Sequence, residues 1–246
     1  MKEVSTKEAC RGGVSVVIGA SSVIAKALIG HLLMQGPVIA ISRQPLTFTA
    51  KGLKSIQSGY SEGEIAALVS ELAVQKYVIS NVFIFNGVLH QDTVKPEKRL
   101  EELSEEAMNT LFKINTITPM MWLKHLMPLV KGDRKCVIAV MSARIGSISD
   151  NRLGGWYSYR ASKAALNMLL QTSAVEYARR AKNVAILAFH PGTTDTPLSK
   201  PFQQNVPKEK LFSPDFVAQR LLAVTQTVTP STQAHFIDWN GEAILW

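Results

Sequence analysis

The sequence of 246 residues contains little cysteine, no long apolar run and no paired histidines. Its two cysteines, Cys10 and Cys136, predict no disulfide. Crossing a bilayer takes roughly 20 consecutive apolar residues, and no stretch of the chain reaches that length. Residues 1–13 also lack the basic-then-apolar layout of a signal peptide. We therefore expect a cytoplasmic protein without membrane attachment, and the scattered histidines predict no metal site.

The positive charge is dispersed along the chain. Lysine and arginine number 27 against 19 acidic residues, so the formal net charge is +8. The two densest basic runs, residues 131–135 and 179–182, fall near the ends of expected helices, where cations stabilise the negative end of the helix dipole. Neither run is interleaved with aromatic residues, as nucleic-acid-binding surfaces often are. A nucleic-acid-binding module is therefore the least favoured hypothesis, and we expect no nucleic-acid partner.

From Val14 onward, short β-branched runs alternate with longer amphipathic stretches. This order predicts βαβ units, which build a parallel sheet with helices on both faces. The expected strands are residues 14–18, 38–42, 53–57, 81–85, 136–141, 183–189 and 234–237. The expected helices are residues 24–34, 62–75, 104–129, 156–180 and 214–227. The sequence thus predicts an N-terminal tail, residues 1–12, and one Rossmann-like α/β domain, residues 13–246, with a doubly wound, mostly parallel seven-stranded sheet.

A tyrosine and a lysine carry the strongest chemical signal. Tyr159 and Lys163 are four residues apart on the expected helix 156–180, so their side chains share one face. A phenol with an unperturbed pKa of about 10 is a weak acid–base partner at neutral pH unless a neighbouring ammonium stabilises the phenolate. The pair therefore predicts a proton-transfer site. Tyr157, two residues earlier, faces another way and is expected to pack or to contact substrate.

A serine lies where the fifth expected strand ends. Ser142 is our choice for a hydroxyl that acts with Tyr159, because sites of this architecture collect at the carboxyl ends of strands; Ser147 is the second choice. Ser142, His190 and Asp195 are also the residue types of a hydrolase triad. No serine of the chain sits in a Gly-x-Ser-x-Gly nucleophile elbow, so we do not expect hydrolysis.

The segments around these residues resemble the short-chain dehydrogenase/reductase family over nearly the whole chain. The resemblance is carried by residues 142–149 and 157–166, by Asn115 within Phe-Lys-Ile-Asn-Thr, and by the run Pro-Gly-Thr-Thr-Asp-Thr at 191–196. Residues 142–166 and 236–241 are similar to the branch related to C-factor cell-signalling proteins. The resemblance implies hydride transfer between a nicotinamide cofactor and a carbonyl or alcohol substrate.

The same resemblance implies roles for four catalytic residues. Tyr159 would donate the proton in reduction, and Lys163 would lower the pKa of Tyr159 and hydrogen-bond the nicotinamide ribose. Ser142 would hold and polarise the substrate carbonyl, and Asn115 would steady a water-mediated proton relay. The separation of Ser142 from Tyr159 is longer than is usual in the family, which implies a short insertion between them.

The phosphate-binding turn is expected where the first strand enters the first helix. There Gly19 matches the family motif Thr-Gly-x-x-x-Gly-x-Gly, whereas Ile18, Val23 and Ala25 replace its threonine and its other two glycines. Val23 is the serious change, because a β-branched residue resists positive φ and adds bulk near the phosphates.

Arg43 follows the second strand, where NAD-dependent relatives carry an acidic residue for the ribose hydroxyls. An arginine can instead pair with a 2′-phosphate, so we expect NADP(H) to be preferred and NAD(H) to be possible. Two further departures are Gly59, where many relatives have an adenine-contacting aspartate, and Phe85, which begins the altered Asn-Asn-Ala-Gly motif. The expected cofactor-binding residues are Gly19, Ser21, Ser22, Val23, Ile24, Arg43, Asn86, Gly87, Tyr159, Lys163, Pro191, Gly192, Thr194 and Thr196.

The leading hypothesis is an NADP(H)-dependent oxidoreductase of a small carbonyl or alcohol, with residues 191–213 as a substrate lid or an ordinary surface loop. The alternative is a catalytically weak nucleotide-sensing or cell-signalling protein on the same fold, with cofactor binding spoiled by Val23 and the altered fourth-strand motif. By the resemblance we expect a homodimer or homotetramer. Met120, Met121 and Trp122 would supply apolar contact either between subunits or in the core.

Overall fold

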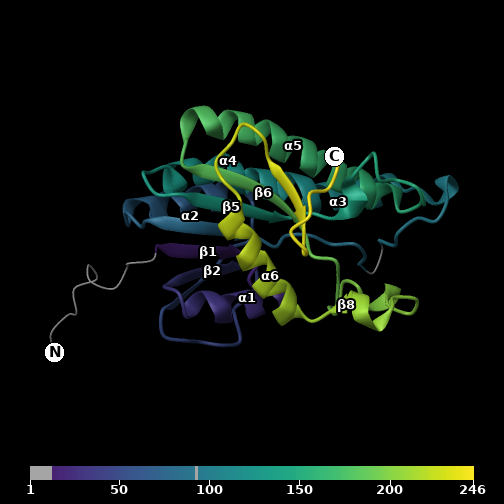
Figure 1. The fold of residues 1–246 in the computed structure, drawn as a ribbon, viewed down its shortest axis with the longest axis horizontal. Coiled ribbons are helices and arrows are strands. Elements are labelled where there is room, and N and C mark those ends of the chain that lie inside the picture. Colours follow the sequence, from purple (N-terminus) through teal and green to yellow (C-terminus); the bar gives the residue numbers. More distant parts are fainter. Residues whose placement is uncertain (1–12, 92–93) are drawn as a thin grey trace.

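The computed structural model describes residues 13–91 and 94–246, so the expected tail and Cys10 lie outside the described residues. Its centre is a seven-stranded sheet of order β3-β2-β1-β4-β5-β6-β9, in which all neighbours run parallel (Figure 1). The strands are β1 (Val14–Ile18), β2 (Val38–Ser42), β3 (Leu53–Gln57), β4 (Ile79–Ile84), β5 (Cys136–Met141), β6 (Val184–His190) and β9 (His235–Asp238). The doubly wound sheet expected from the sequence is thereby confirmed.

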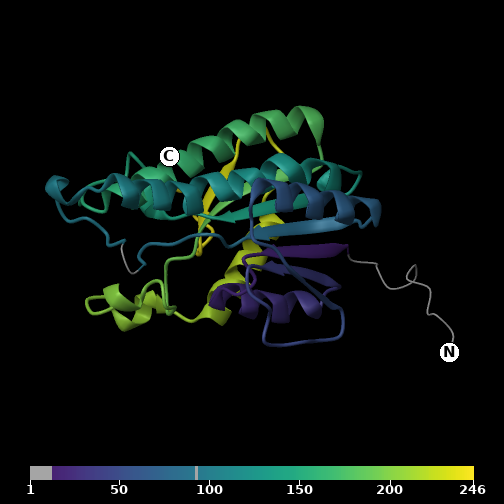
Figure 2. The ribbon, with the colours of Figure 1, turned by 180° about the vertical axis from the view of Figure 1, so that it is seen from behind.

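Helices cover both faces of this sheet (Figures 1 and 2). On one face α1 (Val23–Leu33) packs with α6 (Pro214–Thr227); on the other lie α2 (Glu62–Val74), α4 (Thr118–Val130) and α5 (Tyr157–Arg180). All residues of β1 and β2 are buried, as expected of strands between two helical layers. Trp122 of α4 is fully buried in the core, so it serves packing inside this chain.

The expected helix 104–129 is not one regular helix. It consists of α3 (Glu105–Phe112), a π-helical turn (Lys113–Ile117) and α4. Asn115 and Thr116 are buried in this turn, and the Thr116 hydroxyl donates to the Ser162 carbonyl of α5 (2.7 Å). Apolar spacing does not reveal a π-helical turn, because the chain continues in nearly the same direction through it.

The ends of some other elements also differ from expectation. β4 begins two residues before the expected strand 81–85, because Ile79 pairs with Val14 of β1. The segment 191–213 contains a small ladder, in which β7 (Thr193–Thr194) pairs with β8 (Leu211–Phe212), and 3-10 turns at Lys200–Phe202 and Lys208–Lys210. The two short strands are far apart in sequence, so no local pattern announces their pairing.

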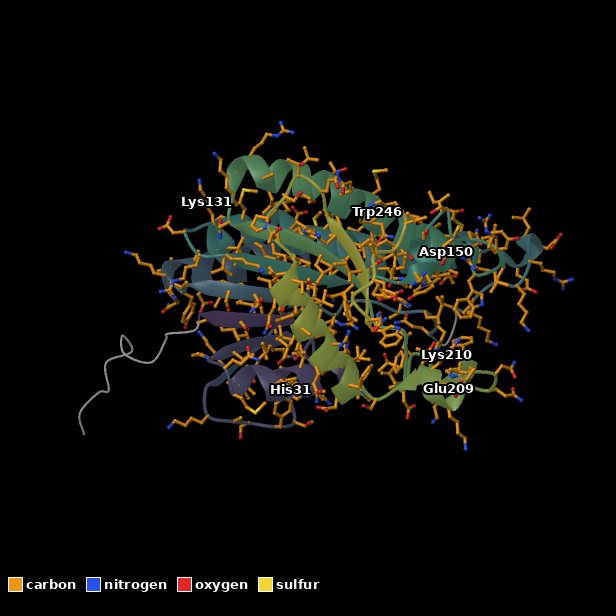
Figure 3. All side chains as sticks on the ribbon, viewed as in Figure 1. His31, Lys131, Asp150, Glu209, Lys210 and Trp246 are labelled. Atoms are coloured by element: carbon orange, nitrogen blue, oxygen red, sulfur yellow. The ribbon has the colours of Figure 1, made fainter. Side chains whose placement is uncertain are left out.

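The carboxyl ends of the strands form the edge at which the site lies. The strand order reverses between β1 and β4, and ligands of open α/β sheets bind in the crevice at such a point. The segment 191–213, in green near β8 in Figure 1, lies at this edge. Glu209 and Lys210 on it are labelled in Figure 3, far from Lys131 at the other end of the sheet. Within the described residues, no helix has the length and apolar character needed to cross a membrane.

Candidate active site

The turn after β1 brings the backbone of Gly19 against the end of β4. Gly19 has a φ of 78°, and a Cβ built on it would lie 3.1 Å from the carbonyl carbon of Phe85. Glycine tolerates both conditions. The Gly19 amide donates to the Ile41 carbonyl (2.9 Å) and to the Tyr60 hydroxyl (3.0 Å), which itself donates to the Ile41 carbonyl (3.0 Å). Tyr60 therefore holds the turn against β2.

Val23 does not strain this turn. It is the first residue of α1, one residue earlier than expected, and its φ is not positive. The strain predicted for valine at this position is therefore wrong. Ser22, the N-cap, makes no side-chain capping bond, so the first-turn amides of α1 remain available to an anion.

Two adjoining cavities open at the carboxyl edge of the sheet, with volumes of about 330 and about 540 Å³. The first is bounded by Tyr159 and Lys163 of α5, and the second by Arg43 after β2. Both are lined by Ser21, Ser22, Phe85, Asn86 and Gly87, which join them into one groove. Every residue that the sequence predicted to bind cofactor lines one of the two cavities.

Asn86 gives an independent sign that a polar ligand belongs in this groove. Its Oδ1 is buried and has no hydrogen-bond partner in the described part of the chain. Buried polar atoms are nearly always paired, so an orphaned acceptor in the wall of a groove indicates a donor on a ligand. Together with Arg43 and the first-turn amides of α1, Asn86 makes the groove fit a phosphorylated nucleotide cofactor.

Tyr159 and Lys163 lie on the first two turns of α5 and line the first cavity. Both are buried, with 8% and 3% of their surfaces exposed. The Lys163 ammonium donates to the Met141 carbonyl at the end of β5 (2.8 Å). A Cβ built on Gly87 would lie 3.4 Å from Lys163 Nζ, so the segment after β4 passes close to the ammonium.

Burial sets the pKa of both groups. Desolvation raises the pKa of Tyr159 to about 12 and lowers the pKa of Lys163 to about 8. The sequence predicted that Lys163 would lower the pKa of Tyr159, but in the structure burial is the dominant effect. Tyr159 is therefore protonated at neutral pH, which is the form that a proton donor requires.

Asn115 is fully buried in the π-helical turn. Its Oδ1 accepts a hydrogen bond from the Val88 amide (2.7 Å), and its Nδ2 donates to the Val88 carbonyl (2.9 Å) and the Ser162 hydroxyl (3.1 Å). These bonds tie the segment after β4 to α5, beside Lys163. The side chain thus positions the cavity wall, and its role in a proton relay stays a prediction.

Ser142 directly follows β5 and lines the first cavity, but its hydroxyl proton is directed into the protein. Oγ donates to Oδ1 of Asn167 on α5 (2.6 Å), and both residues are buried. A hydroxyl has one proton to donate, so in this geometry Ser142 has none for a substrate carbonyl. The next residue, Ala143, packs against the apolar cluster that contains Tyr159. Ser147, the second choice, is buried and accepts from the Asp150 amide (3.1 Å).

The segment after β6 closes the first cavity through Pro191, Gly192, Thr194 and Thr196. Gly192 has a φ of 68°, and a Cβ built on it would lie 2.7 Å from the ring of Phe212 and 2.8 Å from that of Trp239. A side chain at Gly192 would therefore push the segment away from the body of the protein.

The residue types of a hydrolase triad do not assemble. His190 is largely buried, its Nδ1 has no partner in the described residues, and burial lowers its pKa to about 4. The Asp195 carboxylate accepts from Gln203 (3.0 Å), and Ser142 donates to Asn167. Among the described residues, no group of three or more histidine, cysteine or acidic side chains is placed to hold a metal ion.

The family model of the short chain dehydrogenases matches residues 13–207. The chain belongs to the short-chain dehydrogenase family. The enzyme class expected from the sequence, an oxidoreductase, is thereby confirmed.

The chain is similar to two curated proteins with different names. The 1-hydroxy-2-glutathionyl-2-methyl-3-butene dehydrogenase of Rhodococcus sp. (strain AD45) is 28% identical over 186 residues, which are 76% of this chain and 76% of that protein. C-signal of Myxococcus xanthus is 29% identical over 139 residues, 56% of this chain and 78% of that protein. The expected similarity to the C-factor branch is thus confirmed.

A crystal structure of a short-chain dehydrogenase/reductase from Burkholderia multivorans with bound NADP has the same fold. It superposes with a TM-score of 0.79 at 24% sequence identity, covering 95% of this chain and 100% of that chain.

Three residues near the site of this short-chain dehydrogenase escaped prediction. Tyr60 contacts the glycine turn, Trp156 packs beside Tyr159, and Phe202 packs on Trp156. Tyr60 carries no local signal, because its partner Gly19 is 41 residues away. The pair of glycines before Trp156 was a usable sign, since it marks a backbone with unusual φ.

Proposed function

We propose that this short-chain dehydrogenase reduces a carbonyl compound with NADPH, and in reverse oxidises the corresponding alcohol with NADP⁺. The observation that carries the proposal is the pairing of two buried titratable groups on one helix face, Tyr159 and Lys163, in the wall of a groove that also contains the phosphate-type turn. Perturbed groups in a cleft of this kind are typical of catalytic sites.

Residues at three places in the groove would hold the cofactor. The first-turn amides of α1, after Ser22, would bind its phosphates, and Asn86 Oδ1 would accept from one of its donors. Arg43, which lines the second cavity, would pair with a 2′-phosphate, which supports NADP(H) over NAD(H). The NADP bound to the Burkholderia multivorans relative supports the same choice. The cofactor would supply the hydride to the carbonyl carbon.

Tyr159 would donate its proton to the carbonyl oxygen as the hydride reaches the carbon, so that the product is an alcohol. Lys163, oriented by the Met141 carbonyl, would stabilise the phenolate that remains. Asn115 would keep the segment after β4 in place, in addition to its predicted part in a proton relay. Because the Ser142 proton goes to Asn167, we assign Ser142 a positioning role and leave proton donation to Tyr159.

The test combines binding with turnover. Titration with NADPH should raise the melting temperature of the wild type more than NADH does, because a ligand of the folded state stabilises it. Tyr159→Phe should keep the NADPH shift and lower kcat for ketone reduction by at least about 100-fold, the usual scale of general acid catalysis. Tyr157→Phe, the same change two residues earlier at a half-exposed position, serves as control. No shift with either cofactor at millimolar concentration would refute the proposal.

The similarity to C-signal favours a second candidate, a nucleotide-sensing or cell-signalling protein with little turnover. A melting shift with NADPH, accompanied by no reduction of any ketone or aldehyde in a broad panel, would select this candidate.

A further inference from the structure

Segment 191–213 supplies one wall of the first cavity. Its residues 197–199 line the cavity together with Tyr159. The Ser199 hydroxyl donates to the Thr194 carbonyl, so the segment is bonded within itself at the place where it meets the cavity. What holds this self-bonded wall against the body of the protein therefore decides whether the cavity is closed on this side.

Few polar contacts join this wall to the rest of the protein. Within the described part of the chain, residues 196–210 make a single hydrogen bond to a residue outside the segment: the Leu198 carbonyl accepts from Nε2 of His90 (3.2 Å). The Phe202 ring lies 5.7 Å from the His90 ring and 5.0 Å from the Trp156 ring, between ring centroids. His90 thus contacts the segment twice, through a hydrogen bond and through its ring.

The backbone around His90 is held on both sides. Two residues before it, the amide and the carbonyl of Val88 are both bonded to the Asn115 side chain (2.7 and 2.9 Å). Directly after it, the amide and the carbonyl of Gln91 pair with the carbonyl and the amide of Val94 (3.0 and 3.1 Å). These bonds keep the imidazole in place, so His90 is a fixed attachment point for segment 191–213.

The small number of these contacts makes opening of the segment inexpensive. One hydrogen bond contributes a modest net free energy, and a segment with few buried contacts opens locally at a small cost. Segments that bound a reaction cavity open to exchange ligands and close to exclude water from the reacting groups. In this protein the bond between His90 and Leu198 is placed to set the balance between the open and the closed form.

We propose that His90 is a positioning residue for the reaction at Tyr159, because its hydrogen bond to the Leu198 carbonyl holds segment 191–213 closed against a bound carbonyl substrate. The proposal rests on the proposed function for the identity of the reaction. Removal of the bond shifts the segment toward its open form, and a ligand that binds the closed form then binds more weakly. The chemistry at Tyr159 is the same once the segment has closed, so the loss of the bond raises KM and leaves kcat nearly unchanged.

The first measurement is the steady-state reduction of acetophenone at saturating NADPH. His90→Phe keeps a ring beside Phe202 and removes the N–H donor. It should raise KM by about two- to tenfold, the range that corresponds to one net hydrogen bond, and change kcat by less than about twofold. His90→Gln, whose amide can donate to the same carbonyl, should recover most of the loss. His235→Phe is the matched control, because His235 Nε2 also donates to a backbone carbonyl, that of Thr229 (2.9 Å), and lines neither cavity.

The second measurement follows the segment itself and needs no turnover. Chymotrypsin cleaves after aromatic residues, and cleavage after Phe202 requires that its ring leaves those of His90 and Trp156. Without ligand, His90→Phe should be cleaved after Phe202 about two- to tenfold faster than the wild type, because proteolysis of a locally opened segment follows the population of the open form. Cleavage after Phe48, which is half-buried like Phe202 but lies between β2 and β3, is the internal reference and should be unchanged.

The two measurements separate this proposal from the proposed function. If His90→Phe reduces acetophenone with the KM of the wild type and is cleaved after Phe202 at the same rate, the role of His90 is refuted and the proposed function stands. A fall in kcat with an unchanged KM, not recovered in His90→Gln, would also overturn the proposal, because it would show that His90 does not act through the closed segment. Faster cleavage of His90→Phe in a protein that reduces no ketone would support closure by His90 even though the proposed function had failed.

Discussion

Replacing Ser142 by alanine separates the two roles open to this residue. If its hydroxyl binds the substrate carbonyl, the substitution lowers kcat. If it positions α5 against β5, as its bond to Asn167 Oδ1 (2.6 Å) indicates, the substitution lowers the free energy of unfolding. We expect the second result.

The magnitude follows from the surroundings of Asn167. Ser142 and Asn167 are both buried, and Nδ2 of Asn167 already has no partner in the described part of the chain. Ser142→Ala would leave the Oδ1 of the same amide unpaired as well. An unsatisfied buried polar group costs about 1–3 kcal/mol, and about 2 kcal/mol corresponds to a fall of about 4–8 °C in melting temperature for a chain of this length.

The assay measures thermal melting and steady-state ketone reduction on the same preparations, below the melting temperature of the variant. We expect the melting temperature to fall by several degrees and kcat to stay within about threefold of the wild type. Ser147→Ala is the control, since Ser147 is equally buried in the following loop and does not line the first cavity. An unchanged melting temperature with a loss of kcat of about 100-fold or more would refute this reasoning and restore Ser142 as a catalytic residue.

Two further predictions concern charge. Arg43→Ala should weaken NADPH binding by about tenfold or more and leave NADH binding nearly unchanged, because a charge-assisted hydrogen bond is worth about 1.5–3 kcal/mol. If titrations showed that NADPH and NADH binding weaken equally, the role of Arg43 would be contradicted. Lys163 has a pKa of about 8 in the folded chain against 10.5 for the free group, so between these pH values the unfolded chain binds the extra proton and folding becomes more favourable as pH rises. Denaturant unfolding should therefore show that the free energy of unfolding of the wild type rises by about 3 kcal/mol relative to that of Lys163→Met between pH 8 and pH 10.5. An equal change in the two proteins over this pH range would contradict the prediction.

The fold was predictable because its information is local. β1, β2 and β5 have the expected bounds, since a strand buried on both faces needs a continuous run of β-branched and apolar residues. The partly exposed edge strand β3 also has the expected bounds. The proximity of Tyr159 and Lys163 was predictable for the same reason, because four residues make about one helical turn.

What could not be predicted depends on bonds between distant residues. The partner of Ser142 is 25 residues further along the chain, and the backbone partner of Asn115 is 27 residues back. The pKa of Tyr159 depends on how deeply α5 is buried, which a spacing of four does not specify. Val23 was misjudged because the start of α1 moved by one residue, which turned a suspected left-handed position into a helical one.

The π-helical turn Lys113–Ile117 can also be seen as a shift of phase between α3 and α4. A π turn holds one residue more than an α turn, and one residue rotates a helix by about 100°. Leu111 before the turn and Trp122 after it both face the interior only because of that extra residue. Deleting a single residue here would rotate one of the two helices away from the core and carry Asn115 off Val88. The geometry of the site therefore depends on the number of residues in this segment as well as on its side chains. A sequence alignment that shortens the segment by one residue would assign the wrong neighbour to Asn115.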